Sequence, residues 1–189
     1  MYLFFDTETT GLPKLYNAPI TDTDNWPRLV QIAWSLHDKK GKELAKHESI
    51  IKPDGFKIPK QASDVHGITT ERASKEGIEL ESALDQFIWA LKESEHLVAH
   101  NIRFDEKIIG AELVRKGFNH ALMNKNKICT MLASTKYCEI PGRYGFKWPT
   151  LTELHEKLFE EDFPDAHNAL VDVEAMVRCF FELKKRKVL

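Results

Sequence analysis

The sequence predicts one α/β domain built around a mixed five-stranded β-sheet that is flanked by helices. Three observations lead to this prediction. A short all-apolar run opens the chain, two segments with alternating polarity follow it, and segments with helical periodicity then alternate with short apolar runs. The expected element order is βββαβαβα with additional helices. The length of 189 residues suits a single domain, so we expect residues 1–189 to form one unit.

The first three expected strands lie near the amino terminus. Residues 2–5 are all apolar and are followed directly by acidic residues, as in a strand that is buried on both faces. Residues 29–36 alternate, with an apolar side chain at every second position. Residues 38–41 have the composition of a turn, and residues 43–51 can return as an antiparallel partner. At least two of the three strands are therefore expected to form a hairpin.

The remaining elements follow from the alternation between helical and apolar segments. In chain order we expect helix 80–91, strand 97–99, helix 104–117, strand 128–132, helix 150–159 and helix 166–185. Two segments, 13–27 and 139–149, carry proline, glycine and aromatic residues and are expected to be loops. Long loops inside compact domains often have functional roles.

Composition excludes several classes of protein. With 42% hydrophobic and 30% charged residues, the chain is neither disordered nor a disulfide-rich miniprotein. It lacks a run of about 18 apolar residues that could span a membrane, and it does not begin like a secretory signal. Three widely spaced cysteines without a C-x-x-C pair indicate reduced thiols rather than a zinc site. We therefore expect a cytoplasmic protein without a membrane partner.

The net charge of −2 gives no general attraction to polyanions. A nucleic-acid partner would have to be held by local basic groups or by metal ions. The basic run at residues 184–187 is explained by the dipole at the carboxyl end of a helix, which favours cations there.

Asp6 and Glu8 lie two residues apart at the end of the first expected strand. Because side chains on one face of a strand repeat every two residues, both carboxylates face the same side. Two like charges at that distance repel, and one would bind a proton unless a cation compensated. The pair therefore predicts a site for a hard divalent cation, in preference to two acids that simply face water.

Two further acids occupy helices. Asp105 is expected in the first turn of its helix, where an acid also interacts favourably with the helix dipole. Asp172 lies about 60° from Ala169, on the shoulder of the apolar stripe of the last helix. A carboxylate there is costly unless it is paired with a cation, so a salt bridge or a metal is expected. His167 precedes this helix and can overhang the same edge of the sheet.

Together these residues resemble the motifs of the DEDD exonucleases. The motif D-x-E-x-T-G-L matches residues 6–12, the second motif matches residues 100–105, and H-x-A-x-x-D matches residues 167–172. An H-G-I-T segment matches residues 66–69. His167 places the resemblance in the DEDDh branch, typified by the proofreading epsilon subunit of bacterial DNA polymerase III. The resemblance spans nearly the whole chain and implies a ribonuclease H-like fold.

The resemblance also implies an activity and roles for these residues. It implies a 3′–5′ exonuclease that releases nucleoside 5′-monophosphates, with two Mg²⁺ or Mn²⁺ ions as cofactors. Asp6 would bridge the ions, Glu8 and Asp172 would complete one site, and Asp105 would hold the other. His167 would be the general base, since its unperturbed pKa near 6.5 suits that role at neutral pH.

The expected partner is the 3′ end of a nucleic acid, with single-stranded DNA as the expected substrate. The candidates for binding the terminal nucleotide are Thr9, Gly11, Leu12, His66, Asn101 and Phe104. On the loop 139–149, Arg143, Tyr144 and Lys147 are candidates for phosphate contacts, and a solvated loop explains them equally well. The sequence ends soon after the last expected helix, so it predicts a stand-alone nuclease without a polymerase-binding tail.

Three alternatives remain open at this point. An RNA-trimming 3′–5′ exoribonuclease of the same family would carry the same five residues. A haloacid-dehalogenase-like phosphatase also begins with an apolar run and D-x-D-x-T, but here the second acid is Glu8 and a later G-D-x-x-x-D is missing. A non-catalytic nucleic-acid-binding module would keep the fold without turnover.

Overall fold

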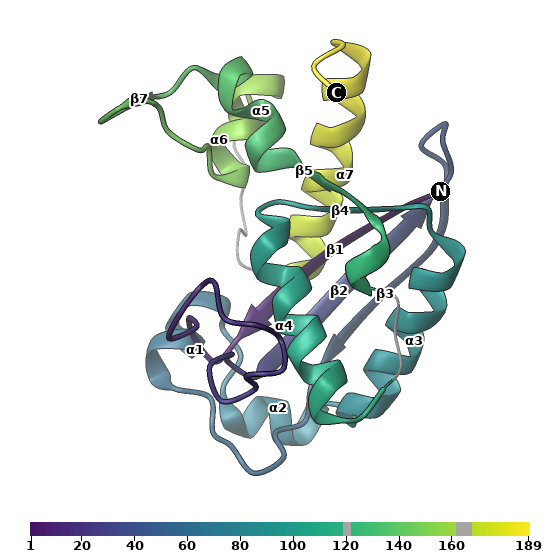
Figure 1. Ribbon diagram of the computed structural model, residues 1–189, viewed down its shortest axis with the longest axis vertical. Helices are drawn as coiled ribbons and strands as arrows, with labels where there is room; N and C mark the ends of the chain where they lie inside the picture. The colour runs from purple at the N-terminus through teal and green to yellow at the C-terminus, as the bar shows by residue number, and fades with distance from the viewer. Residues whose placement is uncertain (119–121, 162–167) are drawn as a thin grey trace.

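The computed structural model describes residues 1–118, 122–161 and 168–189. It contains a five-stranded sheet in the order β3-β2-β1-β4-β5, which confirms the predicted mixed sheet (Figure 1). Strand β2 is antiparallel to β1 and β3, whereas β4 is parallel to both β1 and β5. The strands are β1 Tyr2–Thr9, β2 Leu29–His37, β3 Glu43–Ile50, β4 His96–Ala99 and β5 Asn126–Cys129.

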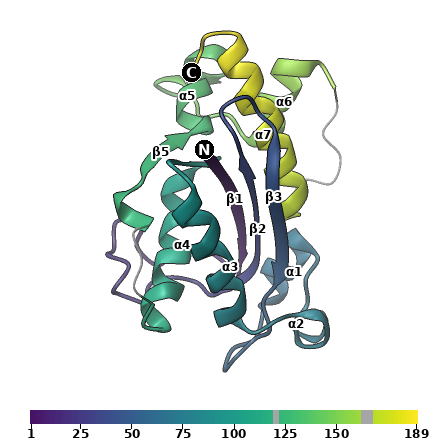
Figure 2. The same cartoon turned by 90° about the vertical axis from the view of Figure 1, so that its right-hand side faces the viewer.

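Helices cover both faces of this sheet. Helices α3 and α4 lie on one face, and α7, with α5 and α6 beside it, lies on the other (Figure 2). The described helices are α1 Lys60–His66, α2 Thr70–Glu76, α3 Leu80–Glu93, α4 Ile102–Arg115, α5 Thr130–Cys138, α6 Leu151–Phe159 and α7 Ala169–Lys185, with a 3₁₀ turn at Leu122–Asn124. A small hairpin, β6 Pro141–Gly142 and β7 Gly145–Phe146, lies between α5 and α6.

Strand β1 is the centre of the core, and its alternation decides which helix each side chain meets. Phe4 packs against Phe180 of α7, with ring centroids 5.1 Å apart. Phe5 points to the other face and packs against Phe87 of α3 at 5.4 Å. Because the alternation continues along the strand, residues 6 and 8 face α7 while residue 7 faces α4.

Some predicted boundaries were wrong. The strand predicted over 128–132 ends at Cys129, and helix α5 begins at Thr130. The buried residues of α5 repeat every four positions, at Thr130, Ser134 and Cys138. This repeat is typical of a helix with one buried face, and it outweighs the apolar run that predicted a strand. Helices α1 and α2 were not predicted, because each is short and its packing rather than its periodicity stabilises it. The segment 139–149 contains the β6–β7 hairpin rather than only loop structure.

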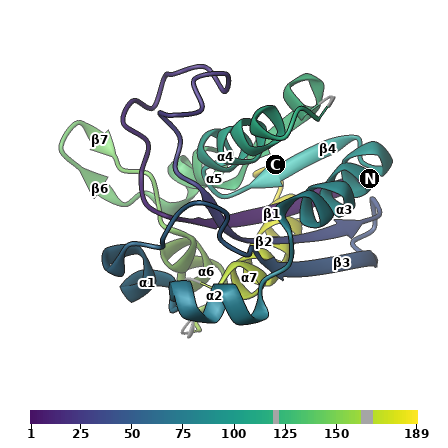
Figure 3. The ribbon, with the colours of Figure 1, turned by 90° about the horizontal axis from the view of Figure 1, so that it is seen from below.

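The loop 13–27 is held against the body by α4. Glu112 is fully buried and pairs with Arg28 and Arg115, each at 2.9 Å. Arg115 also donates to carbonyl oxygens of the loop, and Lys107 donates to another at 2.7 Å. These contacts hold the loop beside the carboxyl end of β1 (Figure 3).

Two further expectations concern cysteines and membranes. All three cysteines, Cys129, Cys138 and Cys179, are free thiols, as predicted. Among the residues that the structure describes, none of the helices combines the length and apolarity needed to cross a membrane.

Candidate active site

Three carboxylates meet at the carboxyl end of β1. Asp6 and Glu8 project from the strand toward α7, and Asp172 projects from the first turn of that helix. One oxygen from each of the three lies within 4.8 Å of the others. The structure therefore brings together three of the four acids that the sequence singled out.

The amino-terminal end of α7 is fixed so that Asp172 faces the strand. Asn168 caps the helix by accepting from the backbone N–H groups of Leu170 and Val171 at 3.1 and 3.3 Å. Gln31 of β2 accepts from the backbone N–H of Ala169 at 3.3 Å and ties the helix to the sheet. The positive end of the helix dipole thus lies beside the three carboxylates and lowers the cost of their charge.

Asp105 approaches from the other side of β1. It lies in the first turn of α4, is buried, and accepts through Oδ1 from the backbone N–H and the hydroxyl of Thr7, at 3.2 and 2.8 Å. Thr7 lies between Asp6 and Glu8 in the chain, so this pair of hydrogen bonds positions Asp105 next to the other acids. Its carboxylate is directed to Thr7, and it is not one of the three groups within 4.8 Å.

The acids hold their protons more tightly than usual. Burial first, then the nearby charges of Asp105, Asp172 and Glu8, raises the pKa of Asp6 well above its ordinary value. Burial, followed by Asp172 and Asp105, raises the pKa of Glu8 to about 8. Burial also raises the pKa of Asp105 to about 7, although the Thr7 hydrogen bonds oppose it. Burial and mutual repulsion therefore disfavour the ionised forms of these acids.

Such a cluster fits a divalent metal ion. Carboxylate oxygens are hard ligands that suit Mg²⁺ and Mn²⁺, and a bound cation would favour the ionised form of each acid. Asp6, Glu8 and Asp172 have the oxygen atoms and the proximity to hold such an ion. His167, the predicted general base, lies outside the described residues.

The residues proposed for the terminal nucleotide line a pocket beside Glu8. This pocket has a volume of about 640 Å³ and includes the loop after β1 and the end of α1; its lining contains Glu8, Thr9, Gly11, Leu12, His66 and Phe104. Asn101 lines an adjoining pocket of about 410 Å³ that shares Phe104. The structure therefore brings five of these six predicted residues into one pocket and places the sixth next to it.

Two backbone conformations shape this pocket. Gly11 has φ of +143°, which side chains other than that of glycine rarely adopt, and its carbonyl accepts from the Thr9 hydroxyl at 2.6 Å. Asn101 adopts the left-handed conformation at φ of +75° and precedes α4, where asparagine is tolerated better than most residues. Its carbonyl accepts from the backbone N–H of Phe104 at 2.8 Å, which begins the helix that carries Asp105.

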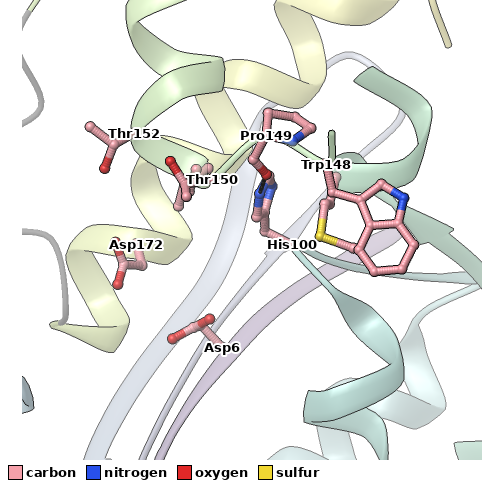
Figure 4. Close-up of a pocket in the computed structure, with 9 residues that line it drawn as sticks. Asp6, His100, Trp148, Pro149, Thr150, Thr152 and Asp172 are labelled. Carbon is pink, nitrogen blue, oxygen red and sulfur yellow. Dashed lines mark hydrogen bonds between the residues drawn. The ribbon is translucent and has the colours of Figure 1, made fainter. Parts of the chain in front are cut away.

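A third pocket, of about 470 Å³, has Asp6 in its lining. Asp6 and Asp172 lie at one end of it, and His100 and Trp148 lie at the other (Figure 4). Sequence reasoning did not assign a role to His100 or Trp148. The signal for His100 was its place at the start of the second motif, and the signal for Trp148 was the aromatic content of the long loop.

The pKa shifts predict that the metal-free protein loses stability as pH rises. Because Glu8 and Asp105 bind protons more tightly in the folded than in the unfolded protein, the folded state holds more protons between about pH 4.5 and 8, and unfolding becomes easier across that window. Asp6→Asn removes one of the repelling charges, so we expect it to raise the Tm at pH 8 in thermal unfolding with chelator. The rise should be about 2–4 °C for each kcal/mol by which the free energy of unfolding increases.

Mg²⁺ or Mn²⁺ should raise the Tm of the wild-type protein at pH 8 and should raise that of Asp6→Asn much less. Asp85→Asn changes an exposed aspartate of α3 and serves as the control. A lower metal-free Tm for Asp6→Asn than for the wild type would contradict the electrostatic account.

Comparison with solved structures places this arrangement in a known fold. One match is Exonuclease I of Escherichia coli, crystallised with a dA16 oligonucleotide. It superposes with a TM-score of 0.73 at 20% identity, over 98% of this chain and 41% of that one. The mixed sheet and its flanking helices thus have the ribonuclease H-like fold that the sequence predicted.

Sequence comparison defines the family. The family described as Exonuclease (RNase_T) matches residues 3–180, and the chain belongs to it. A DNA polymerase III PolC-type protein of Streptococcus sanguinis (strain SK36) is 34% identical over 117 residues, which is 61% of this chain and 7% of that protein. The 3′-5′ exonuclease DinG of Bacillus subtilis (strain 168) is 28% identical over 188 residues, 98% of this chain and 18% of that protein. The chain thus spans less than a fifth of the length of these two relatives.

Proposed function

We propose that this chain is a divalent-metal-dependent 3′–5′ exonuclease that releases nucleoside 5′-monophosphates from single-stranded DNA. One observation carries the proposal: Asp6, Glu8 and Asp172 cluster within 4.8 Å, next to a pocket of about 640 Å³ formed by the loop after β1. A pocket of this size suits a nucleotide. We also propose that residues 1–189 act as one exonuclease domain.

The metal requirement follows from the charge of the reacting group. A phosphodiester is anionic, and further negative charge develops on its oxygens as the bond breaks, so an acidic site needs cations to bind it. Asp6, Glu8 and Asp172 would hold one Mg²⁺ or Mn²⁺, and Asp105 would take part in holding a second. When bound, such ions neutralise phosphate charge and acidify a coordinated water.

The protein groups around the cluster have separate tasks in this proposal. Thr9, Gly11 and Leu12 would contact the terminal nucleotide from the loop after β1, and His66 and Phe104 would enclose it from α1 and α4. His167 would accept the proton of the attacking water. Thr7 holds Asp105 in place through its two hydrogen bonds.

The choice of substrate and polarity is supported by the relatives. Exonuclease I was crystallised with a dA16 oligonucleotide, and DinG is named as a 3′-5′ exonuclease. Parallel digestion of matched single-stranded DNA and RNA tests the substrate class, and faster digestion of the RNA would indicate the exoribonuclease activity instead. Binding of either strand without product would indicate a non-catalytic module.

We expect hydrolysis to require both a free 3′ end and a divalent metal. A linear single-stranded DNA labelled at its 5′ end should shorten progressively with Mg²⁺ or Mn²⁺, while a closed circle of the same sequence should stay intact because it has no terminus. Chelator should stop the reaction, and an excess of metal should restore it. Shortening in chelator, or opening of the circle, would contradict the proposal.

A further inference from the structure

The β6–β7 hairpin exposes an unusual amount of aromatic surface. It projects beyond α5 and α6 at the side of the molecule (Figure 1). The exposed fractions are 89% for Tyr144, 51% for Phe146 and 63% for Trp148. Exposed apolar side chains that gather in one place mark an interaction site on many proteins.

The hairpin has a defined conformation. Pro141 pairs with Phe146, and Gly142 pairs with Gly145. A Cβ atom at position 142 would lie 3.0 Å from both the Gly145 carbonyl oxygen and the Lys147 nitrogen, so glycine allows this close approach. Lys147 donates to Glu153 of α6 at 2.5 Å and ties the hairpin to that helix. The aromatic side chains are therefore displayed by an ordered element.

The base of the hairpin is joined to the carboxylate site. His100 follows β4, and its Nε2 donates to the carbonyl oxygen of Pro149 at 2.9 Å. Its Nδ1 accepts from the Thr130 hydroxyl at 3.0 Å, and burial lowers the pKa of His100, which favours this neutral form. Trp148 precedes Pro149 and lines the same pocket as Asp6 and Asp172. The aromatic surface thus continues into the proposed active site.

The charges of the hairpin suit a polyanion. Arg143 is exposed and lies over the ring of Tyr144, with its Cζ atom 5.2 Å from the ring centroid, whereas Lys147, between Phe146 and Trp148 in the sequence, pairs with Glu153. Alternation of cations with aromatic rings is typical of surfaces that bind single-stranded nucleic acid, where bases stack on the rings and cations meet the phosphates. This complementarity distinguishes the surface from a purely apolar protein-docking face.

We propose that the β6–β7 hairpin binds the single strand on the 5′ side of the terminal nucleotide. Bases of that segment stack on Tyr144 and Phe146, and Arg143 pairs with a phosphate. Trp148 connects this surface to the pocket at Asp6. The inference rests on the proposed exonuclease function and adds a second region of contact with the substrate. This region favours unpaired substrates, because bases can stack on the rings only when they are free of a complementary strand.

Two substrates separate this contact from the reaction itself. The 4-nitrophenyl ester of thymidine 5′-monophosphate has no upstream strand, whereas a single-stranded octanucleotide has one. For Tyr144→Ala and for Phe146→Ala, we expect the ratio of kcat/KM on the octanucleotide to kcat/KM on the ester to fall about 10-fold, within the range for loss of base stacking. Trp89→Ala removes a tryptophan of α3 that is 50% exposed, and as the control it should leave the ratio unchanged.

The phosphate contact has its own readout. Arg143→Ala should lower the salt dependence of KM for the octanucleotide, with a change of about 0.7 in the slope of log KM against log salt concentration. Circular dichroism and Tm of each variant should match the wild type, since the changed side chains are exposed.

The outcomes distinguish the two proposals. If the wild-type protein hydrolyses neither substrate with Mg²⁺ or Mn²⁺, the proposed function fails. If the wild type hydrolyses both and the hairpin variants keep its ratio and its salt slope, the exonuclease proposal stands and the role of the hairpin is wrong.

Discussion

Asp6→Asn is expected to lower the rate of DNA hydrolysis by at least about 10²–10³, the usual loss when one electrostatic stabiliser of a reaction is removed. Asp6 is the acid whose pKa responds to all three of its acidic neighbours, Asp105, Asp172 and Glu8, so it occupies the centre of the cluster. Asparagine keeps the shape of the side chain but removes the charge that a cation would balance. The loss should appear in single-turnover cleavage of a labelled oligonucleotide at saturating metal.

The same variant separates chemistry from folding. Because Asp6→Asn is also expected to raise the Tm of the metal-free protein, a lost rate in a more stable protein cannot come from unfolding. Asp85→Asn on α3 is the matched control and should retain wild-type turnover. A rate for Asp6→Asn above about a tenth of the wild-type rate would refute the central role of Asp6.

His167→Ala should slow the chemical step by about 10²–10⁴, the range for a positioned acid–base group. Since a general base does not have to bind metal, the metal concentration needed for half-maximal activity and the affinity for the oligonucleotide should stay close to those of the wild type. Asp172→Asn should instead raise the metal requirement, because it removes a ligand from the cluster.

The dependence of the hydrolysis rate on pH gives a second test of His167 as the general base. A histidine acts as a base only when neutral, so the wild-type rate at saturating metal should rise with pH through the pKa of His167, and His167→Ala should flatten that rise. His47→Ala, on the edge strand β3, is the control and should keep the wild-type profile. Near-wild-type turnover of His167→Ala, or full rescue by added metal, would show that another group takes the proton.

Local spacing was sufficient to predict the faces of the acidic residues. Asp6 and Glu8 share a face because a strand has a period of two, and covalent geometry sets that period wherever the strand forms. Asp172 lies on the shoulder of the apolar stripe of α7 because a helix has a period of 3.6. Asp105 falls in the first turn of α4, as its position in the sequence predicted.

Other features depend on contacts between distant parts of the chain. Thr7 donates two hydrogen bonds to Asp105, which lies 98 positions away in the sequence, and no local period indicates this contact. The contact of His100 with Pro149 spans 49 positions. Helix α1 packs Ala62 into a small core with Val30 and Ile68, so tertiary packing, not its own periodicity, accounts for it.

The sequence by itself determined the mixed sheet, the strand that carries Asp6 and Glu8, and the resemblance to the exonuclease family, because these follow from periods and motifs along the chain. Only the tertiary structure decided that α7 places Asp172 within 4.8 Å of both acids, that Asp105 is turned to Thr7, and that Trp148, which follows the β6–β7 hairpin, lines a pocket with Asp6 and Asp172. The physical reason is that burial and proximity, which raise the pKa values of these acids, arise when separate elements pack together.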